Sequence, residues 1–184
     1  MSDFEFKKFP SIKRLNRECV ITEKLDGANA QIIFDSLGNM FCGSRKREIT
    51  PEDDNHGFAK WCYENQESIF VVLGEGRHYG EWWGSGIQRR YGKVNDDKVF
   101  SLFNTGRWEE RDCDAVEGLS VVPVIYRGDF NTKAVEDAMT ILRHASIAAP
   151  EFKKPEGIVI YHSQLDEMFK VTYEHDEKGK PFGA

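Results

Sequence analysis

Short runs of apolar residues bounded by polar or turn residues recur along the chain, and such runs are typical of β-strands. Glu18–Thr22 is the first such stretch. Asn29–Asp35 and Met40–Ser44 follow, and the Ser-Leu-Gly-Asn sequence of residues 36–39 between them is a turn signal. The pattern predicts one strand followed by an antiparallel hairpin.

More strands are expected further along, where short runs rich in β-branched and aromatic residues are bounded by glycine or polar residues. These runs are Tyr79–Trp83, Val99–Phe103, Ser120–Tyr126, Gly157–Tyr161 and Met168–Tyr173, the last two as an antiparallel pair. A glycine-rich loop at residues 84–92 separates the first two runs. It lacks the Gly-Lys-Ser/Thr sequence of a P-loop, so we do not interpret it as one.

Two segments place apolar residues at helical spacing. Phe58–Leu73 follows a polar loop at residues 51–55, and Thr132–Ala145 begins with a threonine that can cap a helix. No repeat, low-complexity tract or linker divides the chain, so we expect a single domain over residues 1–184. The elements predict an α+β fold of mostly antiparallel sheets with flanking helices.

Composition narrows the class of protein. The chain has 184 residues, 40% hydrophobic and 30% charged, as is ordinary for soluble globular proteins. No apolar run approaches the ~20 residues of a membrane span, and the N-terminus lacks a signal-peptide core. Four widely spaced cysteines predict reduced thiols and a cytoplasmic location, the host cytoplasm if the protein is viral. The five scattered histidines argue against a zinc site.

The formal net charge is −6, which argues against a protein that holds long nucleic acids on a uniformly basic surface. Basic residues nevertheless cluster at residues 45–47 and at residues 89–90. Such clusters suit an anionic ligand, and they are also common in solvated loops.

Residues 22–29 read Thr-Glu-Lys-Leu-Asp-Gly-Ala-Asn, which places Lys24 between acidic neighbours and before a glycine turn. One interpretation is a β-turn with an exposed lysine, because Asp-Gly is a common hairpin signal. The other is a nucleophilic lysine, which requires surroundings that favour its neutral amine. The segments downstream favour the nucleophile.

Four later segments each carry a charged residue at a distinctive place: Arg45 at the far end of the hairpin, Glu81 among aromatic residues, Glu156 before an apolar strand, and Lys170 on the last strand. In this order the set resembles the covalent nucleotidyltransferase superfamily of polynucleotide ligases and capping enzymes. It is most similar to the RNA ligases of the phage and RNA-editing type.

The resemblance covers residues 18–173. The matching segments are Lys24–Asn29 (the lysine motif), Tyr79-Gly80-Glu81 (the central glutamate motif), Phe103-Asn104 (the base-stacking segment), Glu156-Gly157 (the metal glutamate motif) and Lys170 (the phosphate-binding motif). The resemblance implies an adenylation-domain fold of the ATP-grasp-like ligase type that uses ATP with Mg²⁺ or Mn²⁺.

The resemblance also implies a role for each residue. Lys24 would attack the α-phosphate of ATP to form lysyl-AMP. The other implied contacts are adenine for the backbone or side chain of Glu23, phosphate or metal-bound water for Asn29, ribose or RNA phosphate for Arg45, ribose or metal for Glu81, adenine stacking for Phe103, metal for Glu156 and the α-phosphate for Lys170. Such chemistry needs a divalent cation on the triphosphate and cations at the α-phosphate.

Nucleic-acid ends are expected to contact four arginines: Arg45, Arg47, Arg89 and Arg90. The chain departs from the family pattern after Lys170, where Thr172 stands in place of a second lysine, unless Lys178 or Lys180 replaces it. Ligases of this superfamily usually carry another domain after the adenylation core. We expect no additional C-terminal nucleic-acid-binding domain here, so a protein partner could supply the grip on RNA.

The sequence therefore predicts an ATP-dependent polynucleotide ligase, and the resemblance favours an RNA ligase. It would adenylylate itself, transfer AMP to a 5′-phosphate and join that end to a 3′-hydroxyl. Its partners would be ATP and RNA ends or nicked nucleic acid, with no membrane. The alternatives are a nucleotidyltransferase with another acceptor, of the capping type or a protein, and a non-catalytic nucleotide-binding module. Intact Lys24, Glu81 and Glu156 argue against the last.

Overall fold

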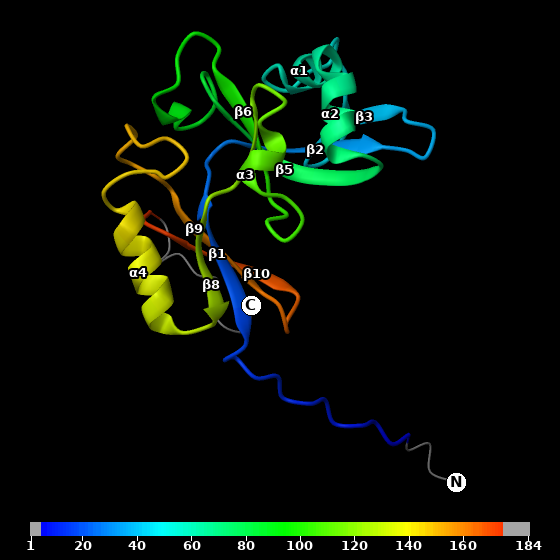
Figure 1. Ribbon diagram of the computed structural model, residues 1–184. Coiled ribbons are helices and arrows are strands. Elements are labelled where there is room, and N and C mark those ends of the chain that lie inside the picture. The colour runs from blue at the N-terminus through cyan, green and yellow to red at the C-terminus, as the bar shows by residue number, and fades with distance from the viewer. Residues whose placement is uncertain (1–4, 175–184) are drawn as a thin grey trace.

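The computed structural model describes residues 5–174, which form an α+β fold with two β-sheets (Figure 1). The smaller sheet contains β1 (Glu18–Lys24), β8 (Val124–Asp129), β9 (Gly157–His162) and β10 (Glu167–Thr172), in the order β10-β9-β1-β8. All its pairings are antiparallel.

The larger sheet has the order β4-β3-β2-β5-β6-β7. Its strands are β2 (Ala28–Phe34), β3 (Met40–Ser44), β4 (Glu48–Ile49), β5 (Gly76–Gly84), β6 (Lys98–Leu102) and β7 (Leu119–Val121). Only β6 and β7 pair in parallel. The described helices are α1 (Phe58–Glu64), α2 (Gln66–Leu73), α3 (Glu110–Cys113) and α4 (Thr132–Leu142), with a 3₁₀ turn at Arg90–Gly92. None of them has the length and apolar character needed to cross a membrane.

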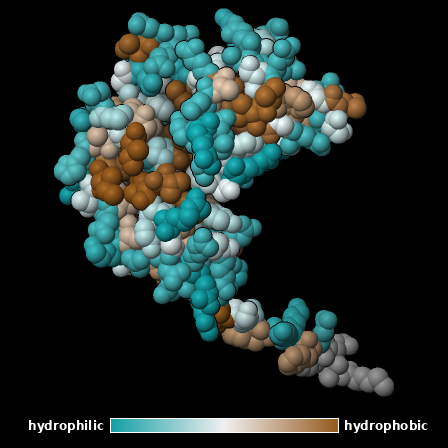
Figure 2. Space-filling model, viewed as in Figure 1, coloured by the Kyte–Doolittle hydropathy of each residue, from teal (hydrophilic) through white to brown (hydrophobic). Residues whose placement is uncertain are grey.

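Each sheet buries one face against helices. In the larger sheet, Ile32 and Phe100 pack in one core with Phe58 and Ile69 of α1 and α2. In the smaller sheet, residues such as Ile158 pack against α4. On the other face of the larger sheet, Glu81 and Trp83 are also buried, whereas Tyr79 is exposed. Figure 2 shows the surface hollowed between the part that carries the larger sheet and the part that carries β10.

Two predicted elements are divided in the structure. The single helix expected over residues 58–73 is two helices, because Asn65 leaves the helical conformation with φ −116° and ψ 14°. The strand expected over residues 120–126 is two strands in different sheets, β7 and β8. Pro123 lies between them, and proline has no N–H to donate to a sheet ladder. This short connection therefore links the two sheets.

The last helix also differs at both ends from the prediction. Asn131, rather than Thr132, caps α4, because its side-chain oxygen accepts a hydrogen bond from the backbone N–H of Ala134 at 2.8 Å. The helix ends at Leu142 instead of continuing to Ala145.

Candidate active site

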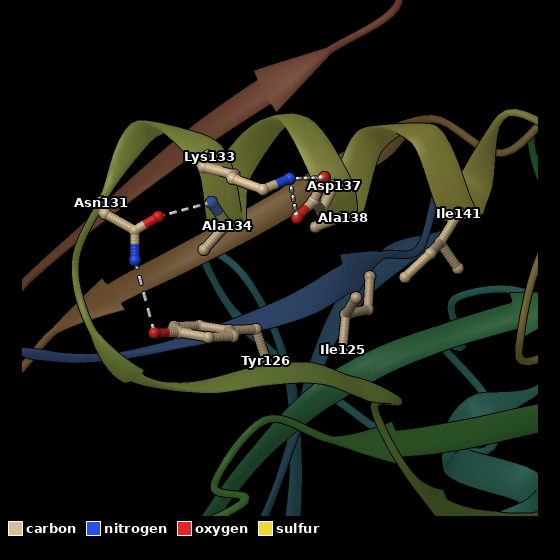
Figure 3. Close-up of a pocket in the computed structure, with 8 residues that line it drawn as sticks. All are labelled: Ile125, Tyr126, Asn131, Lys133, Ala134, Asp137, Ala138 and Ile141. Atoms are coloured by element: carbon tan, nitrogen blue, oxygen red, sulfur yellow. Dashed lines mark hydrogen bonds and ion pairs between the residues drawn. The ribbon is translucent and has the colours of Figure 1, made fainter.

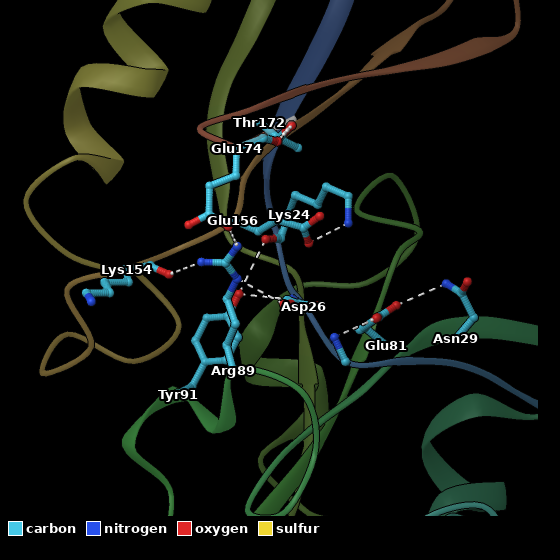
Figure 4. A network of polar contacts seen from close by, with 11 residues as sticks. Lys24, Asp26, Asn29, Glu81, Arg89, Tyr91, Lys154, Glu156, Thr172 and Glu174 are labelled. Atoms are coloured by element: carbon cyan, nitrogen blue, oxygen red, sulfur yellow. Dashed lines mark hydrogen bonds and ion pairs between the residues drawn. The ribbon is translucent and has the colours of Figure 1, made fainter. Parts of the chain in front are cut away.

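Lys24 is the last residue of β1, where the chain leaves the smaller sheet for the larger one. Strand alternation buries Ile21 and Glu23 toward α4 and turns Thr22 and Lys24 to the open face. Lys24 Nζ lies 2.6 Å from Glu156 Oε2, and the two side chains are 24% and 19% exposed (Figure 4). The pair therefore lies at the open junction of the sheets, partly accessible to solvent.

A glycine brings Glu156 to this position. Gly157 pairs with Lys24 on one side and with Thr172 on the other. Its φ is +150°, and a Cβ there would collide with the carbonyl oxygen of Val171. Only glycine fits without strain, so the Glu-Gly sequence places the carboxylate directly beside the lysine.

Glu81 holds the turn that follows the lysine. Its Oε1 accepts a hydrogen bond from the N–H of Gly27 at 2.9 Å, and its Oε2 accepts one from the amide of Asn29 at 3.0 Å. Burial raises the pKa of Glu81 to about 7, although the Gly27 N–H and the Lys24 charge act in the opposite direction. Tyr91 adds a third support, because its hydroxyl accepts the N–H of Asp26 at 2.9 Å.

The open face beside Lys24 offers an apolar surface. Thr22, Val159 and Lys170 form one row across β1, β9 and β10, next to the row of Lys24. Phe103 follows β6 and is 40% exposed. The backbone of Val122 hydrogen-bonds to that of Leu102, so the chain enters β8 close to Phe103. A half-exposed ring near a valine-bearing sheet face suits a planar base.

The side chain of Glu23, the predicted adenine contact, lies on the opposite face of the smaller sheet from Lys24. Its carboxylate is buried on the α4 side and accepts hydrogen bonds from the N–H groups of Ile147 and Ala148 at 2.8 and 3.0 Å. Burial raises the pKa of this carboxyl group. The side chain therefore points away from the face of Lys24, and only the Glu23 backbone lies beside that face.

Arg89 belongs to an internal network. Its guanidinium donates to Asp26 and to Glu174, both at 2.9 Å, and to the carbonyl oxygen of Lys154 at 3.2 Å (Figure 4). These bonds tie the glycine-rich loop to the lysine turn and to the segment after β10. The guanidinium is thus engaged with protein groups, and its predicted contact with nucleic acid would require these bonds to change.

The remaining predicted cations lie at the surface. Arg45 is exposed at the β3–β4 turn, whereas Arg47 pairs there with Asp53 at 2.6 Å. Arg90 and Lys170 are exposed, and neither side chain makes an ion pair or hydrogen bond among residues 5–174. Lys178 and Lys180 lie outside the described residues. Thr172 occupies the row of Lys24, and its hydroxyl donates to the carbonyl oxygen of Glu174 at 2.8 Å.

Of the two predicted metal ligands, Glu81 and Glu156, only Glu156 has a carboxylate oxygen without a hydrogen bond among residues 5–174. Residues 5–174 contain no group of three or more His, Cys, Asp or Glu side chains that could hold a metal. Glu81 uses both oxygens in hydrogen bonds, whereas Glu156 uses only Oε2. One free carboxylate oxygen suits Mg²⁺ or Mn²⁺, since such a cation takes its other ligands from water and from a phosphate substrate.

A second groove lies away from this chemistry. It runs between β8 and α4 and is lined by Ile125, Tyr126, Asn131, Lys133, Asp137 and Ile141, among others (Figure 3). Its one charged pair, Lys133 with Asp137, is an exposed contact within the helix. The groove is on the α4 side of the sheet, opposite the face of Lys24, and has no arrangement suited to phosphate chemistry.

Sequence reasoning missed the supports of the lysine turn. Tyr91 and Asp26 contact each other across 65 positions of sequence, and Asn29 reaches Glu81 across 52. The register of β2 against β5 places Asn29 directly opposite Glu81. The sequence shows an asparagine at the start of one predicted strand and a single glutamate in an aromatic strand. It does not show the register that places them opposite each other.

Comparisons with known proteins identify the family and the fold of this chain. The family model for RNA ligases matches residues 17–172. The comparison with curated proteins gave no match. Among solved structures, the fold is similar to that of RNA ligase from Naegleria gruberi. A substituted form with AMP and manganese gives a TM-score of 0.63 at 18% identity. Another with ATP and manganese gives 0.60 at 19%, and the ligase with pyrophosphate gives 0.63 at 17%.

These alignments cover 90%, 89% and 89% of this chain and 52%, 52% and 53% of the Naegleria chains, respectively. The chain thus spans about half the length of the ligase it resembles. At these identities the likeness establishes the fold. The family match, by contrast, includes every residue from Lys24 to Lys170 that builds the candidate site.

Proposed function

Since the chain belongs to the RNA ligase family, we propose that it is an ATP-dependent RNA ligase that forms a lysyl-AMP intermediate on Lys24. The observation that carries the proposal is the Lys24–Glu156 pair, 2.6 Å long, at the open junction of the two sheets. A lysine paired with one carboxylate, on a sheet face that also carries Lys170, matches the needs of nucleotidyl transfer.

Lys24 must present a neutral amine in order to attack. Its Nζ lies 2.6 Å from Glu156 Oε2, so this contact must open before the amine can reach the α-phosphorus. A divalent cation bound through Glu156 would offset charge on the triphosphate and on departing pyrophosphate. The Naegleria gruberi ligase structures contain ATP or AMP with manganese, which supports the same requirement here.

In the first step, the bond from Lys24 Nζ to the α-phosphorus forms as the bond from that phosphorus to pyrophosphate breaks. Glu81, Asn29 and Tyr91 hold the turn after Lys24, which restricts the approach of the amine. Lys170 lies on the same sheet face, one row further along, and can stabilise the negative charge that develops on the α-phosphate.

In the later steps, the 5′-phosphate of an RNA end takes AMP from Lys24, and a 3′-hydroxyl then displaces AMP to form the new phosphodiester. The proposal includes a protein partner that strengthens the hold on RNA, because a net charge of −6 argues against a uniformly basic surface on this chain. Arg45 and the exposed Arg90 are candidate RNA contacts within this chain.

The deciding experiment is an intact-mass measurement after incubation with ATP and Mg²⁺. We expect one acid-labile AMP adduct on the wild-type protein and none on Lys24→Ala. The matched control is Lys133→Ala, since that lysine lies on α4 and pairs only with Asp137. No adduct, or an adduct that survives Lys24→Ala, would contradict the proposal.

A sealing assay then tests the acceptor. Matched nicked duplexes should differ only in the sugar of the 3′-hydroxyl strand, and we expect better sealing with a ribonucleotide there. Equal sealing of the all-DNA nick would indicate a general polynucleotide ligase. Adenylylation without sealing of any end would favour another acceptor or an absent partner.

A further inference from the structure

The open face of the larger sheet continues outward from the lysine site. Asn29 lies opposite Glu81, Gln31 opposite Tyr79 and Ile33 opposite Arg77. These residues share one face because they are two positions apart on each strand. The opposite face of the same strands is covered by α1 and α2 (Figure 1).

Aromatic rings on this face are unusually accessible. Tyr79 is 54% exposed and Phe41, on the neighbouring β3, is 39% exposed. Neither ring takes part in an aromatic pair, and the Tyr79 hydroxyl makes no hydrogen bond, among residues 5–174. On the covered face, by contrast, Phe58, Trp82 and Phe100 pack closely against one another. Exposed rings on an uncovered sheet face are typical of a binding surface.

Positive charge gathers on the same face. Arg77 donates a hydrogen bond to the side-chain oxygen of Gln31 at 2.8 Å, which leaves its charge without a carboxylate partner. A groove on this face is lined by Phe41, Arg45, Lys46, Arg77 and Glu48, among others. Arg45 and Lys46 make no ion pair within the described part of the chain. Unpaired cations beside accessible rings fit a ligand that has both anionic groups and flat apolar groups.

Single-stranded nucleic acid has this chemistry. Its separated bases can stack on Tyr79 and Phe41 while its phosphates meet Arg77 and Arg45. In a duplex the base faces are hidden in the helical stack. The five residues from Arg77 to Glu81 span about 13 Å of β5, so the surface leads directly into the lysine site. The hollow in Figure 2 leaves this approach open.

We propose that the open face of β2, β3 and β5 binds a single-stranded RNA end and leads it to Lys24. The link to Lys24 rests on the proposed ligase function, whereas the binding itself does not. The inference is that this face binds single-stranded RNA in preference to duplex RNA.

The test measures binding without ATP, so that it is independent of lysyl-AMP formation. A labelled single strand of about 12 nucleotides, within the usual range of site sizes, is compared with a blunt RNA duplex of the same length. We expect tighter binding of the single strand. Tyr79→Ala should weaken that binding roughly tenfold, and Tyr79→Phe should retain it, because stacking needs the ring and not the hydroxyl.

Two further variants complete the design. Arg77→Ala should lower the slope of log affinity against log salt by about 0.7, the value for one single-strand phosphate contact. Tyr63→Ala is the matched control, since Tyr63 is an exposed tyrosine of α1, the helix that packs on the covered face. Thermal melting of each variant checks that it folds.

Three outcomes would overturn the inference: no binding of the single strand, equal or better binding of the duplex, or equal effects of Tyr79→Ala and Tyr63→Ala. If lysyl-AMP forms normally and any of these is observed, the inference fails while the ligase proposal stands. If the single strand binds as expected and no lysyl-AMP forms, the reverse holds.

Discussion

The two sheets hold their key carboxylates in opposite ways. At the end of the smaller sheet, Glu156 is partly exposed, and among residues 5–174 its side chain hydrogen-bonds only to Lys24. On the larger sheet, Glu81 is 7% exposed and both its oxygens accept hydrogen bonds. A group that must change partners during a reaction cannot be fully bonded and buried, because each lost bond would cost free energy. A group that holds other residues in place is fixed more firmly when it is buried and all its hydrogen bonds are made. Glu156 is therefore suited to chemistry, and Glu81 to positioning.

The strongest test of this contrast is Glu156→Ala. We expect the rate of adenylylation to fall at least about 100-fold, because a contact to the reacting groups is lost. Stability should change little, since a partly exposed ion pair contributes little to folding. Rates follow from time-resolved intact mass and stability from urea unfolding. Glu174→Ala is the control, because Glu174 bonds to Arg89 at the surface and not to Lys24. Full activity of Glu156→Ala, or in excess chelator, would contradict the metal assignment.

The burial of Glu81 also predicts that the free energy of unfolding depends on pH. Burial raises its pKa from 4.5 to about 7, so the folded protein binds this proton more tightly than the unfolded chain does. The free energy of unfolding should therefore fall as pH rises from about 4.5 to about 7, by up to about 3 kcal/mol from this group, and level off above. In Glu81→Gln this decline should be smaller. Part of the decline that remains in Glu81→Gln would come from Glu23, because burial also raises the pKa of that carboxyl group.

Urea unfolding at several pH values measures this slope. Glu64→Gln is a suitable control, because Glu64 is an exposed acid on α1. Identical slopes for the wild-type protein and Glu81→Gln would mean that Glu81 is not the group responsible.

At Gly27, in the turn that follows Lys24, the neighbouring atoms leave no room for a side chain. A Cβ on Gly27 would collide with the carbonyl oxygen of Trp82 and lie 2.8 Å from Trp83 Cβ. We expect Gly27→Ala to destabilise the fold by about 2 kcal/mol through overpacking. Gly86→Ala is the comparison, because no atom lies within 4 Å of its Cβ position. Its φ of +76° should cost about 1 kcal/mol. Thermal melts that rank the two variants in the opposite order would contradict the packing around Gly27.

The smallest effect is expected at Thr172, in the same row as Lys24 on the smaller sheet. Thr172→Lys adds a cation near the developing phosphate charge, so adenylylation should be unchanged or a few-fold faster. Thr172→Val is the control for shape without charge. A sharp loss of activity in the folded Thr172→Lys protein would show that the threonine has a role of its own, such as its bond to the Glu174 carbonyl.

Much of the fold follows from local pattern. The hairpin of β2 and β3 and the pair of β9 and β10 lie where short apolar runs and turn residues predict them, because both depend on neighbours in sequence. Predictions failed at two residues that interrupt a continuous apolar pattern. Pro123 separates β7 from β8, although the apolar run on both sides is continuous. Asn65 divides a helix whose apolar spacing continues past it.

The sequence by itself determined the chemistry of this protein: one lysine before a glycine turn, two glutamates beside glycines and a lysine on the last strand, all in the order of the RNA ligase family. These are choices of residue type in short motifs, and they can be recognised without coordinates. Only the tertiary structure decided which of these groups meet. Lys24 and Glu156 are 132 positions apart, and strand register brings them to 2.6 Å. Register and burial also turned Glu23 toward α4, engaged Arg89 and left Tyr79 and Arg77 on an open face. These outcomes depend on long-range pairing, which no local period records.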